Sequence, residues 1–168
     1  MMLRDVTEAD ATLVADLFRD SFTETFGHLY APEDLAVFLA SKTPADFTLE
    51  IADPAFHFQV AGGAEGKPLG FVNLGPPNFP IETPPGTIEL RQIYVLEHAT
   101  EQGVGAALMD WAIDRAQVSG ARHLQLSVYI DNARARRFYE KRGFAVIASY
   151  TFMVGNHADE DIIMRAAL

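Results

Sequence analysis

The sequence predicts a mixed α/β fold, in which a mixed central β-sheet is flanked by helices. Apolar residues recur at helical spacing in the first third of the chain, and from Phe56 onward they alternate as in strands. A strand–helix–strand step, between residues 87 and 129, then indicates a right-handed parallel unit. With 168 residues, 49% of them hydrophobic, the chain is long enough to bury a core. We therefore expect residues 1–168 to form a single domain.

The N-terminal segments begin with a short strand, Met2–Val6. Thr7 is a candidate N-cap for a helix with acidic residues in its first turn, and Gly27 marks the helix end. Pro32 and Thr43–Pro44 open two further helices. The segments FHFQVA and LGFVNLG are predicted to form a β-hairpin, because the turn-rich GGAEGKP joins them.

The C-terminal segments follow a proline-rich stretch, residues 75–86, which must be a loop. Predicted strands and helices then alternate, in chain order: strand 87–95, helix 103–119, strand 123–129, helix 132–142, and strands 144–154 and 161–168. The acidic run His157–Asp161 is predicted to be a polar loop, because it lacks the ordered ligand spacing of a calcium site. Its acidic side chains could instead attract a polyamine. The five histidines are scattered, so no metal site is expected.

The charge and composition narrow the function classes. A formal net charge of −10 disfavours binding to nucleic-acid phosphates and suits cationic partners, although solubility alone can explain it. The absence of cysteine fits a cytosolic protein and leaves no thiol nucleophile. The N-terminus turns polar after three residues, and no apolar run has membrane-spanning length. We expect a cytoplasmic protein without a membrane partner.

The segment EQGVGAALMDWA indicates a phosphate-binding turn. Gly103 and Gly105 allow a tight bend at a helix start, where unpaired N–H groups and the helix dipole attract an anion. The predicted donors are the main-chain amides of the consecutive residues Gln102, Gly103, Val104, Gly105 and Ala106. The segment lacks the lysine of a P-loop and the third glycine of a dinucleotide-binding turn. A purely structural Gly-x-Gly remains the alternative.

The strand over residues 87–95 changes phase along its length. Ile88 and Leu90 lie on one face by alternation, whereas Ile93 and Val95 lie on the other. Alternation therefore slips by one residue near Arg91, which is what a β-bulge does. The alternative is a regular strand that is buried on both faces.

The motifs of the C-terminal half together resemble the GNAT superfamily of N-acetyltransferases. The resemblance rests on a strand ending in Ile93-Tyr94-Val95, the Gly-x-Gly helix, Asn132-x-x-Ala135 and Phe138-Tyr139-x-x-x-Gly143-Phe144. It implies acetyl-CoA binding, a splayed pair of central strands, acetylation of an amine and a homodimer. The segments SFTETF and FMVGNHADEDIIM are similar to the spermidine/spermine N-acetyltransferase subgroup.

The same resemblance assigns contacts with acetyl-CoA. It implies a bulge whose N–H faces the thioester carbonyl, with the backbone of Ile93, Tyr94 and Val95 along the pantetheine. Asn132 is both a helix cap and a cofactor contact. The side chains of Arg136, Arg137 and Lys141 either meet the phosphates or belong to a solvated helix face. Thr100 departs from the family, which usually has Gln or Arg there, and this change is expected to weaken pyrophosphate binding.

Tyr139 and Glu89 are the candidate catalytic residues. A tyrosine of pKa about 10 is protonated at neutral pH and can donate to a departing thiolate, although a packing role is the alternative for Tyr139. An amine of pKa about 10.4 must lose a proton before attack, and Glu89 is the candidate base, acting through water. Glu89 could instead only pair with Arg91 or Lys67. Neither a cysteine nor a serine elbow is present, so the amine is expected to attack directly.

These observations predict an N-acetyltransferase that acts on a primary amine, expected to be a polyamine or another small amine. The alternatives are acetylation of a protein or antibiotic amine, and a domain that binds acyl-CoA as a sensor without turnover.

Overall fold

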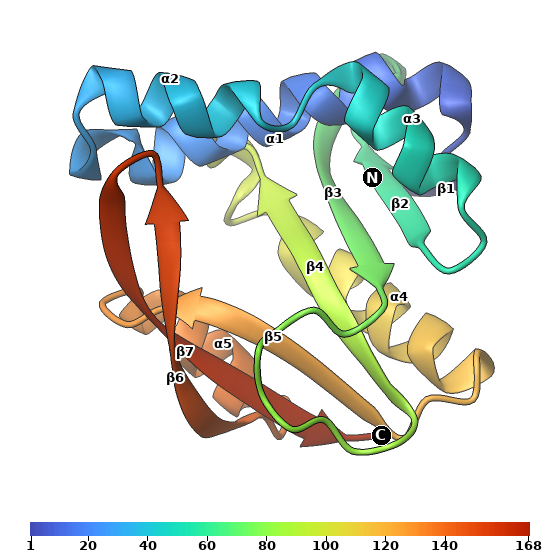
Figure 1. Cartoon of the computed structure of the whole chain (residues 1–168). Coiled ribbons are helices and arrows are strands. Elements are labelled where there is room, and N and C mark those ends of the chain that lie inside the picture. Colours follow the sequence, from blue (N-terminus) through green and yellow to red (C-terminus); the bar gives the residue numbers. More distant parts are fainter.

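The computed structural model describes residues 1–168 and contains one seven-stranded sheet in the order β1-β2-β3-β4-β5-β7-β6 (Figure 1). Its strands are β1 Met2–Asp5, β2 His57–Gly62, β3 Pro68–Gly75, β4 Thr87–Val95, β5 His123–Tyr129, β6 Ala145–Val154 and β7 His157–Ala167. The predicted mixed sheet is confirmed, because β4 and β5 pair in parallel and every other pair is antiparallel.

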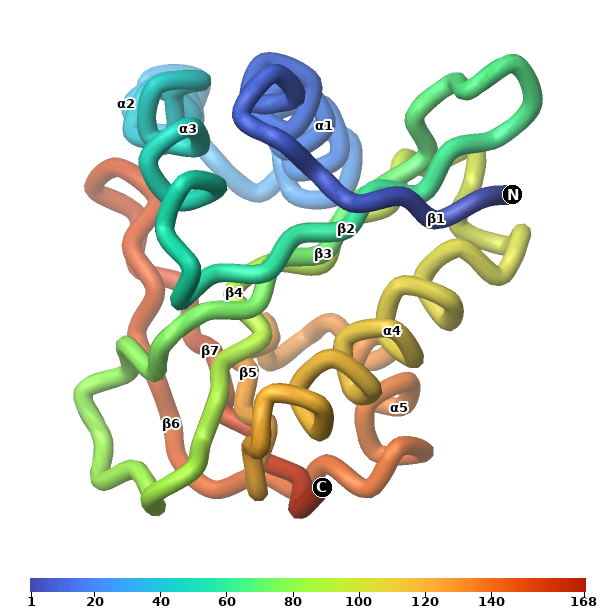
Figure 2. Tube along the Cα trace, turned by 90° about the vertical axis from the view of Figure 1, so that its right-hand side faces the viewer, coloured from blue at the N-terminus to red at the C-terminus, as the bar shows by residue number.

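Five helices cover the two faces of the sheet: α1 Ala11–Phe26, α2 Pro32–Ala40, α3 Pro44–Ala52, α4 Val104–Val118 and α5 Ala133–Glu140. Figure 2 shows α1, α2 and α3 on one side of the sheet, and α4 and α5 on the other. No helix is long and apolar enough to cross a membrane.

Two apolar cores follow from this arrangement. Leu108 and Met109 of α4 pack with Leu124 and Leu126 of β5 on one face of the sheet. On the other face, a core rich in phenylalanine joins α1, α3 and the hairpin of β2 and β3, and its largest buried rings are Phe18, Phe47 and Phe71. Burial of these rings holds α1 and α3 against the sheet, and both helices line the cavity described below.

The predicted helix starts and ends are largely confirmed. Thr43 accepts a hydrogen bond from the Asp46 N–H at 3.3 Å, so it caps α3, and Asp46 Oδ2 accepts from the Thr43 N–H at 2.7 Å. Thr7 caps a short 3-10 turn, Glu8–Asp10, and the α-helix begins only at Ala11.

The prediction of a polar loop over His157–Asp161 is wrong, because β7 begins at His157 and the turn is made by Gly155 and Asn156. Along this part of β7, Asp159 and Asp161 are buried whereas Glu160 is exposed. The run therefore alternates with the period of a strand. The buried positions of this run hold carboxylates and not apolar side chains, so the sequence shows no alternation of apolar and polar residues here.

The two central strands diverge, as the family resemblance implies. Parallel pairing of β4 and β5 extends only from Thr87↔His123 to Glu89↔Gln125. From this paired end the ribbons of β4 and β5 diverge (Figure 1). The remainder of β4 pairs with β3 alone, and the remainder of β5 pairs with β7 alone.

The predicted β-bulge is also confirmed. Asn73 of β3 lies opposite Gln92, but the next residue, Leu74, lies opposite Leu90, so Arg91 is the extra residue of β4. The slip brings Ile93 and Val95 onto the side of the sheet that Leu90 faces, where all three pack against the core under α4.

Close approach of β3 and β4 depends on a glycine at position 70. A Cβ at Gly70 would lie 2.4 Å from the Tyr94 carbonyl oxygen and 3.0 Å from Val95 Cα, both of which are backbone atoms. A Gly70→Ala change is therefore expected to lower the free energy of unfolding by about 1–3 kcal/mol in urea denaturation. Gly62→Ala is the matched control, because the nearest atom to its Cβ would be 3.7 Å away. Equal losses in the two variants would refute this account.

Candidate active site

A cavity of about 380 Å³ occupies the opening between β4 and β5. It is bounded by aromatic residues of α1 and α2 on one side and by α5 on the other, so it passes through the sheet from one helical layer to the other. Volumes of this size are typical of small-molecule sites. Both candidate catalytic residues, Glu89 and Tyr139, line it.

The N-terminus of α4 carries a group of free amides. Gly103 adopts a left-handed conformation with φ +77°, which turns the chain into the helix. The main-chain N–H groups of Gly103, Val104, Gly105 and Ala106 make no hydrogen bond within the protein. The N–H of Gln102 instead donates to the Ala99 carbonyl at 3.2 Å, so this one of the five predicted donors is already engaged. Four convergent donors at a helix N-terminus suit a phosphate or pyrophosphate.

A cation that the sequence did not reveal lies beside these amides. Arg134, at the start of α5, donates from Nη2 to the Thr100 carbonyl at 3.5 Å. Thr100 itself donates from Oγ1 to the Glu97 carbonyl at 2.9 Å and closes the turn before α4. Arg134 thus supplies positive charge near a position where the family usually has Gln or Arg. This contact between the first turn of α5 and the turn before α4 could not be predicted from sequence spacing.

The other predicted cationic contacts are not brought to the cavity. Arg136 donates from Nη1 to the Ile130 carbonyl at 3.0 Å and so serves the turn before α5. The side chains of Arg137 and Lys141 are exposed. Asn132 lines the cavity, and its Oδ1 accepts from the Ala135 N–H at 3.1 Å, so its predicted role as a helix cap is confirmed.

The open edge of β4 carries main-chain groups that face the cavity. The N–H of Leu96 donates to the Leu69 carbonyl at 2.9 Å and so points toward β3. Because main-chain groups alternate along a strand, those of Ile93 and Val95 point the other way, toward the opening. The predicted contacts of Ile93 and Val95 with pantetheine would use these groups, whereas the main chain of Tyr94 is turned toward β3.

The sequence left two alternatives for Tyr139, a packing role and proton donation, and its position agrees with both. Its ring packs between Phe138 and Phe144, at centroid distances of 5.4 and 5.8 Å, and only 7% of the residue is exposed. Its hydroxyl makes no hydrogen bond with the protein, and the residue lines the cavity. Burial raises the pKa of Tyr139 to about 12, although the charge of Arg142 opposes the rise. The phenol is therefore protonated at neutral pH.

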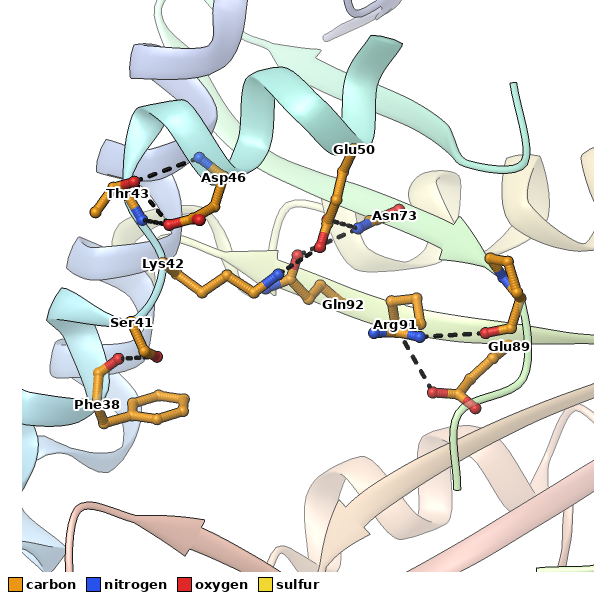
Figure 3. Close-up of polar contacts among 11 residues, drawn as sticks. Phe38, Ser41, Lys42, Thr43, Asp46, Glu50, Asn73, Glu89, Arg91 and Gln92 are labelled. Carbon is orange, nitrogen blue, oxygen red and sulfur yellow. Dashed lines mark hydrogen bonds and ion pairs between the residues drawn. The ribbon is translucent and has the colours of Figure 1, made fainter. Parts of the chain in front are cut away.

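Glu89 is held in a fixed position at the point where β4 and β5 part. Its Oε2 accepts from the Asn78 N–H at 2.8 Å and from Gln125 Nε2 at 3.3 Å. Figure 3 shows Arg91, whose Nε lies 3.7 Å from Oε1. The ion pair with Arg91 exists, and no contact with Lys67 is present. Only 3% of Glu89 is exposed, and burial raises its pKa more than these partners lower it. Such a carboxylate is a stronger base than one in water.

Comparison with known proteins identifies the family. The acetyltransferase (GNAT) family matches residues 12–144 of the chain. The chain belongs to this family. It is an acyl-CoA-dependent N-acetyltransferase.

Two relatives and one solved structure illustrate the similarity. An uncharacterised N-acetyltransferase of Mycobacterium tuberculosis is 33% identical over 80% of this acetyltransferase and 82% of the relative. Another, from Lactobacillus delbrueckii subsp. lactis, is 29% identical over 97% and 95% of the two chains. Among solved structures, the chain is similar to the crystal structure of the PaiA N-acetyltransferase of Thermoplasma acidophilum in complex with coenzyme A. The TM-score is 0.78 and the identity 22%, and the match covers 99% of this chain and 98% of the other. The two proteins therefore share the fold.

The acetyltransferase has two further acids in its cavity, both from the acidic run that was predicted to be a loop. Asp159 and Asp161 lie two residues apart on β7, and each is 6% exposed. Asp159 accepts a hydrogen bond from the Tyr30 hydroxyl and lies 3.3 Å from His157 Nε2. Burial, together with the charge of Asp159, raises the pKa of Asp161 to about 6.

A polar corner of the cavity lies between α3 and β3 (Figure 3). Lys42 Nζ is 2.6 Å from Glu50 Oε1, and Asn73 Nδ2 donates to Glu50 Oε2 at 3.1 Å. The amide of Asn73 also reaches Gln92 Oε1 at 3.4 Å. The charges of Lys42 and Glu50 therefore compensate each other inside the protein.

The N-terminal aromatic residues serve both the core and the cavity. Phe22 is buried and stacks on Tyr30 at a centroid distance of 5.9 Å, and Phe26 packs on Phe22 at 5.2 Å. All three line the cavity, so the expectation of a wall for the acceptor agrees with their positions.

Proposed function

We propose that this acetyltransferase acetylates a primary amine of a small cationic acceptor, a polyamine or another small amine. The observation that carries the proposal is the charge of the cavity. Three nearly buried carboxylates, Glu89, Asp159 and Asp161, line it, and of these only Glu89 forms an ion pair with an arginine or lysine, Arg91. Buried carboxylates attract an ammonium group and repel an anionic one.

The size of the cavity supports a small acceptor. About 380 Å³ accommodates an aliphatic amine together with the acyl end of the cosubstrate, but not a folded protein surface. The aromatic walls from α1 and α2 suit the methylene groups of such an amine. We further propose that residues 1–168 act as one catalytic domain, in the cytoplasm and as a homodimer.

The residues that would hold acetyl-CoA fit its chemistry. The free amides of Gly103 to Ala106, with Arg134 beside them, suit the pyrophosphate, and the open edge of β4 at Ile93 and Val95 suits the amide-containing pantetheine. Acetyl-CoA supplies an acyl group that is activated as a thioester. The predicted contributions of Tyr94, Asn132, Arg136 and Lys141 remain part of the proposal, with Arg136 and Lys141 the weakest.

Proton transfer is assigned to two side chains. Glu89 Oε1 or Oε2 accepts the proton of the incoming ammonium, directly or through water, because an amine attacks only in its neutral form. Tyr139 Oη donates its proton to the departing thiolate sulfur. Fixed placement of both groups around one cavity lowers the entropic cost of the reaction.

The test is a panel of amines in an assay of CoA thiol release. Spermidine, putrescine and n-butylamine represent cationic acceptors, and an aminoglycoside and a lysine peptide represent the other acceptor classes. The proposal expects the highest kcat/KM among the small aliphatic amines. Higher kcat/KM with the lysine peptide would overturn it, and acetyl-CoA binding without turnover of any amine would favour a sensor.

A Glu89→Gln variant tests the base. At pH 7 its kcat is expected to fall about 10-fold, because water alone must then remove the proton. The deficit should shrink as the pH approaches 10, since the free amine becomes abundant near its pKa of about 10.4. A deficit that is independent of pH would instead indicate that Glu89 only positions the acceptor.

A further inference from the structure

Asp161 is a buried charge without a counter-ion. Glu89 pairs with Arg91, Glu50 pairs with Lys42, and Asp159 has its own hydrogen-bond and ion-pair partners. No Lys, Arg or His forms an ion pair with Asp161, although only 6% of it is exposed. Burial and the charge of Asp159 raise its pKa more than the nearby Ser127 hydroxyl lowers it. An unpaired buried carboxylate is costly, and a cationic ligand would remove that cost.

The surroundings of Asp161 are aromatic on both sides. In the sheet, Tyr129 of β5 and Tyr150 of β6 lie directly opposite Asp161, so the three side chains share one face. All three line the cavity. Phe79, from the proline-rich loop, packs against the Tyr150 ring at 5.1 Å. A carboxylate between aromatic rings matches an organic ammonium group, which binds by charge and by cation–π attraction.

Tyr150 also relates Asp161 to the proposed base. Burial raises the pKa of Tyr150, the charges of Glu89 and Asp161 raise it further, and all three residues line the same cavity. The cavity therefore offers two negative positions, with an aromatic surface near each of them. That pattern suits a molecule with two ammonium groups joined by methylene groups.

A metal ion fits these side chains poorly. Calcium takes six to eight oxygen ligands and magnesium about six. The second carboxylate, Asp159, is occupied by the Tyr30 hydroxyl and by His157, and the other neighbours include only one aliphatic hydroxyl, that of Ser127, beside the aromatic rings. The unpaired charge thus fits an organic cation better than a hard metal.

We infer that Asp161, with Tyr129 and Tyr150, binds a second ammonium group of the acceptor while the reacting amine lies at Glu89. The preferred acceptors are then diamines and longer polyamines, and monoamines of the same length are poor substrates. This inference rests on the proposed function and adds to it the number and position of the charges recognised.

The test compares putrescine with n-butylamine, which have the same number of carbon atoms. In the wild type, putrescine should have the lower KM. Asp161→Asn should raise the KM for putrescine about 10-fold more than the KM for n-butylamine, the effect of one partly buried ion pair. Asp114→Asn, on the exposed face of α4, makes the same change of net charge away from the cavity and should change neither KM.

A measurement without acetyl-CoA tests the subsite separately from catalysis. Asp161→Asn should raise the Tm of the ligand-free protein by about 2–4 °C, because the change removes an unpaired buried charge. Putrescine should raise the Tm of the wild type and not that of the variant. If no amine is acetylated but putrescine still raises the Tm through Asp161, the proposed function fails and the subsite stands. An equal rise of KM for putrescine and for n-butylamine in Asp161→Asn, or no rise for either amine, would overturn the inference.

Discussion

A Tyr139→Phe enzyme is expected to bind acetyl-CoA as tightly as the wild type and to turn it over about 100- to 1,000-fold more slowly. The hydroxyl of Tyr139 makes no hydrogen bond with the protein, so its removal leaves no buried group unsatisfied. The phenylalanine ring keeps the packing against Phe138 and Phe144. Tm and the dissociation constant of acetyl-CoA should therefore stay unchanged while kcat falls. Rapid-quench measurement of the acetyl-transfer step reports this loss directly.

The matched control is Tyr94→Phe. Tyr94 is a second tyrosine of the cavity, its hydroxyl also lacks a hydrogen bond, and burial raises its pKa still further than that of Tyr139. Its ring packs against Phe18 and Phe71, at centroid distances of 5.6 and 5.9 Å, and a phenylalanine preserves these contacts. Loss of this hydroxyl should reduce kcat by less than about 3-fold, since small changes in cavity polarity have small effects. A comparable loss in both variants would assign the effect to polarity and not to proton donation.

Much of the fold was predictable because local signals and tertiary structure agree. Apolar periodicity and capping residues identified every helix, and glycines 103, 120 and 143 lie at helix ends with positive φ. The change of phase between Leu90 and Ile93 revealed the bulge, because each face of β4 must still match the core. These signals depend only on residues that are near each other in sequence.

The part of the site that escaped prediction depends on contacts between distant residues. The Tyr30 hydroxyl meets Asp159 across 129 positions, and Asn73 meets Glu50 across 23. Asp159 was assigned to a loop but lies at a buried position of β7, where charged side chains are rare. A local conflict between polar composition and strand alternation is therefore a signal of a site, and the run from His157 to Asp161 contains it.

A negative charge placed beside the free amides at the start of α4 is expected to stabilise the protein and to weaken its binding of CoA. Gly105 lies within the first turn, and a Cβ there would meet only Val95 Cγ2, at 3.8 Å. An aspartate at position 105 should interact favourably with the helix dipole and raise the free energy of unfolding by about 0.3–1 kcal/mol. Its charge would at the same time occupy the region where the pyrophosphate must lie. The dissociation constant of CoA is then expected to rise about 10- to 100-fold, because charge-assisted hydrogen bonds are lost.

Gly105→Asn is the control that isolates the charge, since asparagine has the shape of aspartate and no charge at pH 7. Titration calorimetry with CoA should rank the dissociation constants as wild type, then Gly105→Asn, then Gly105→Asp. Urea denaturation should give the aspartate variant the greater stability of the two. If the amides are merely the beginning of a helix and hold no phosphate, both variants will bind CoA equally well, and their difference in stability will remain.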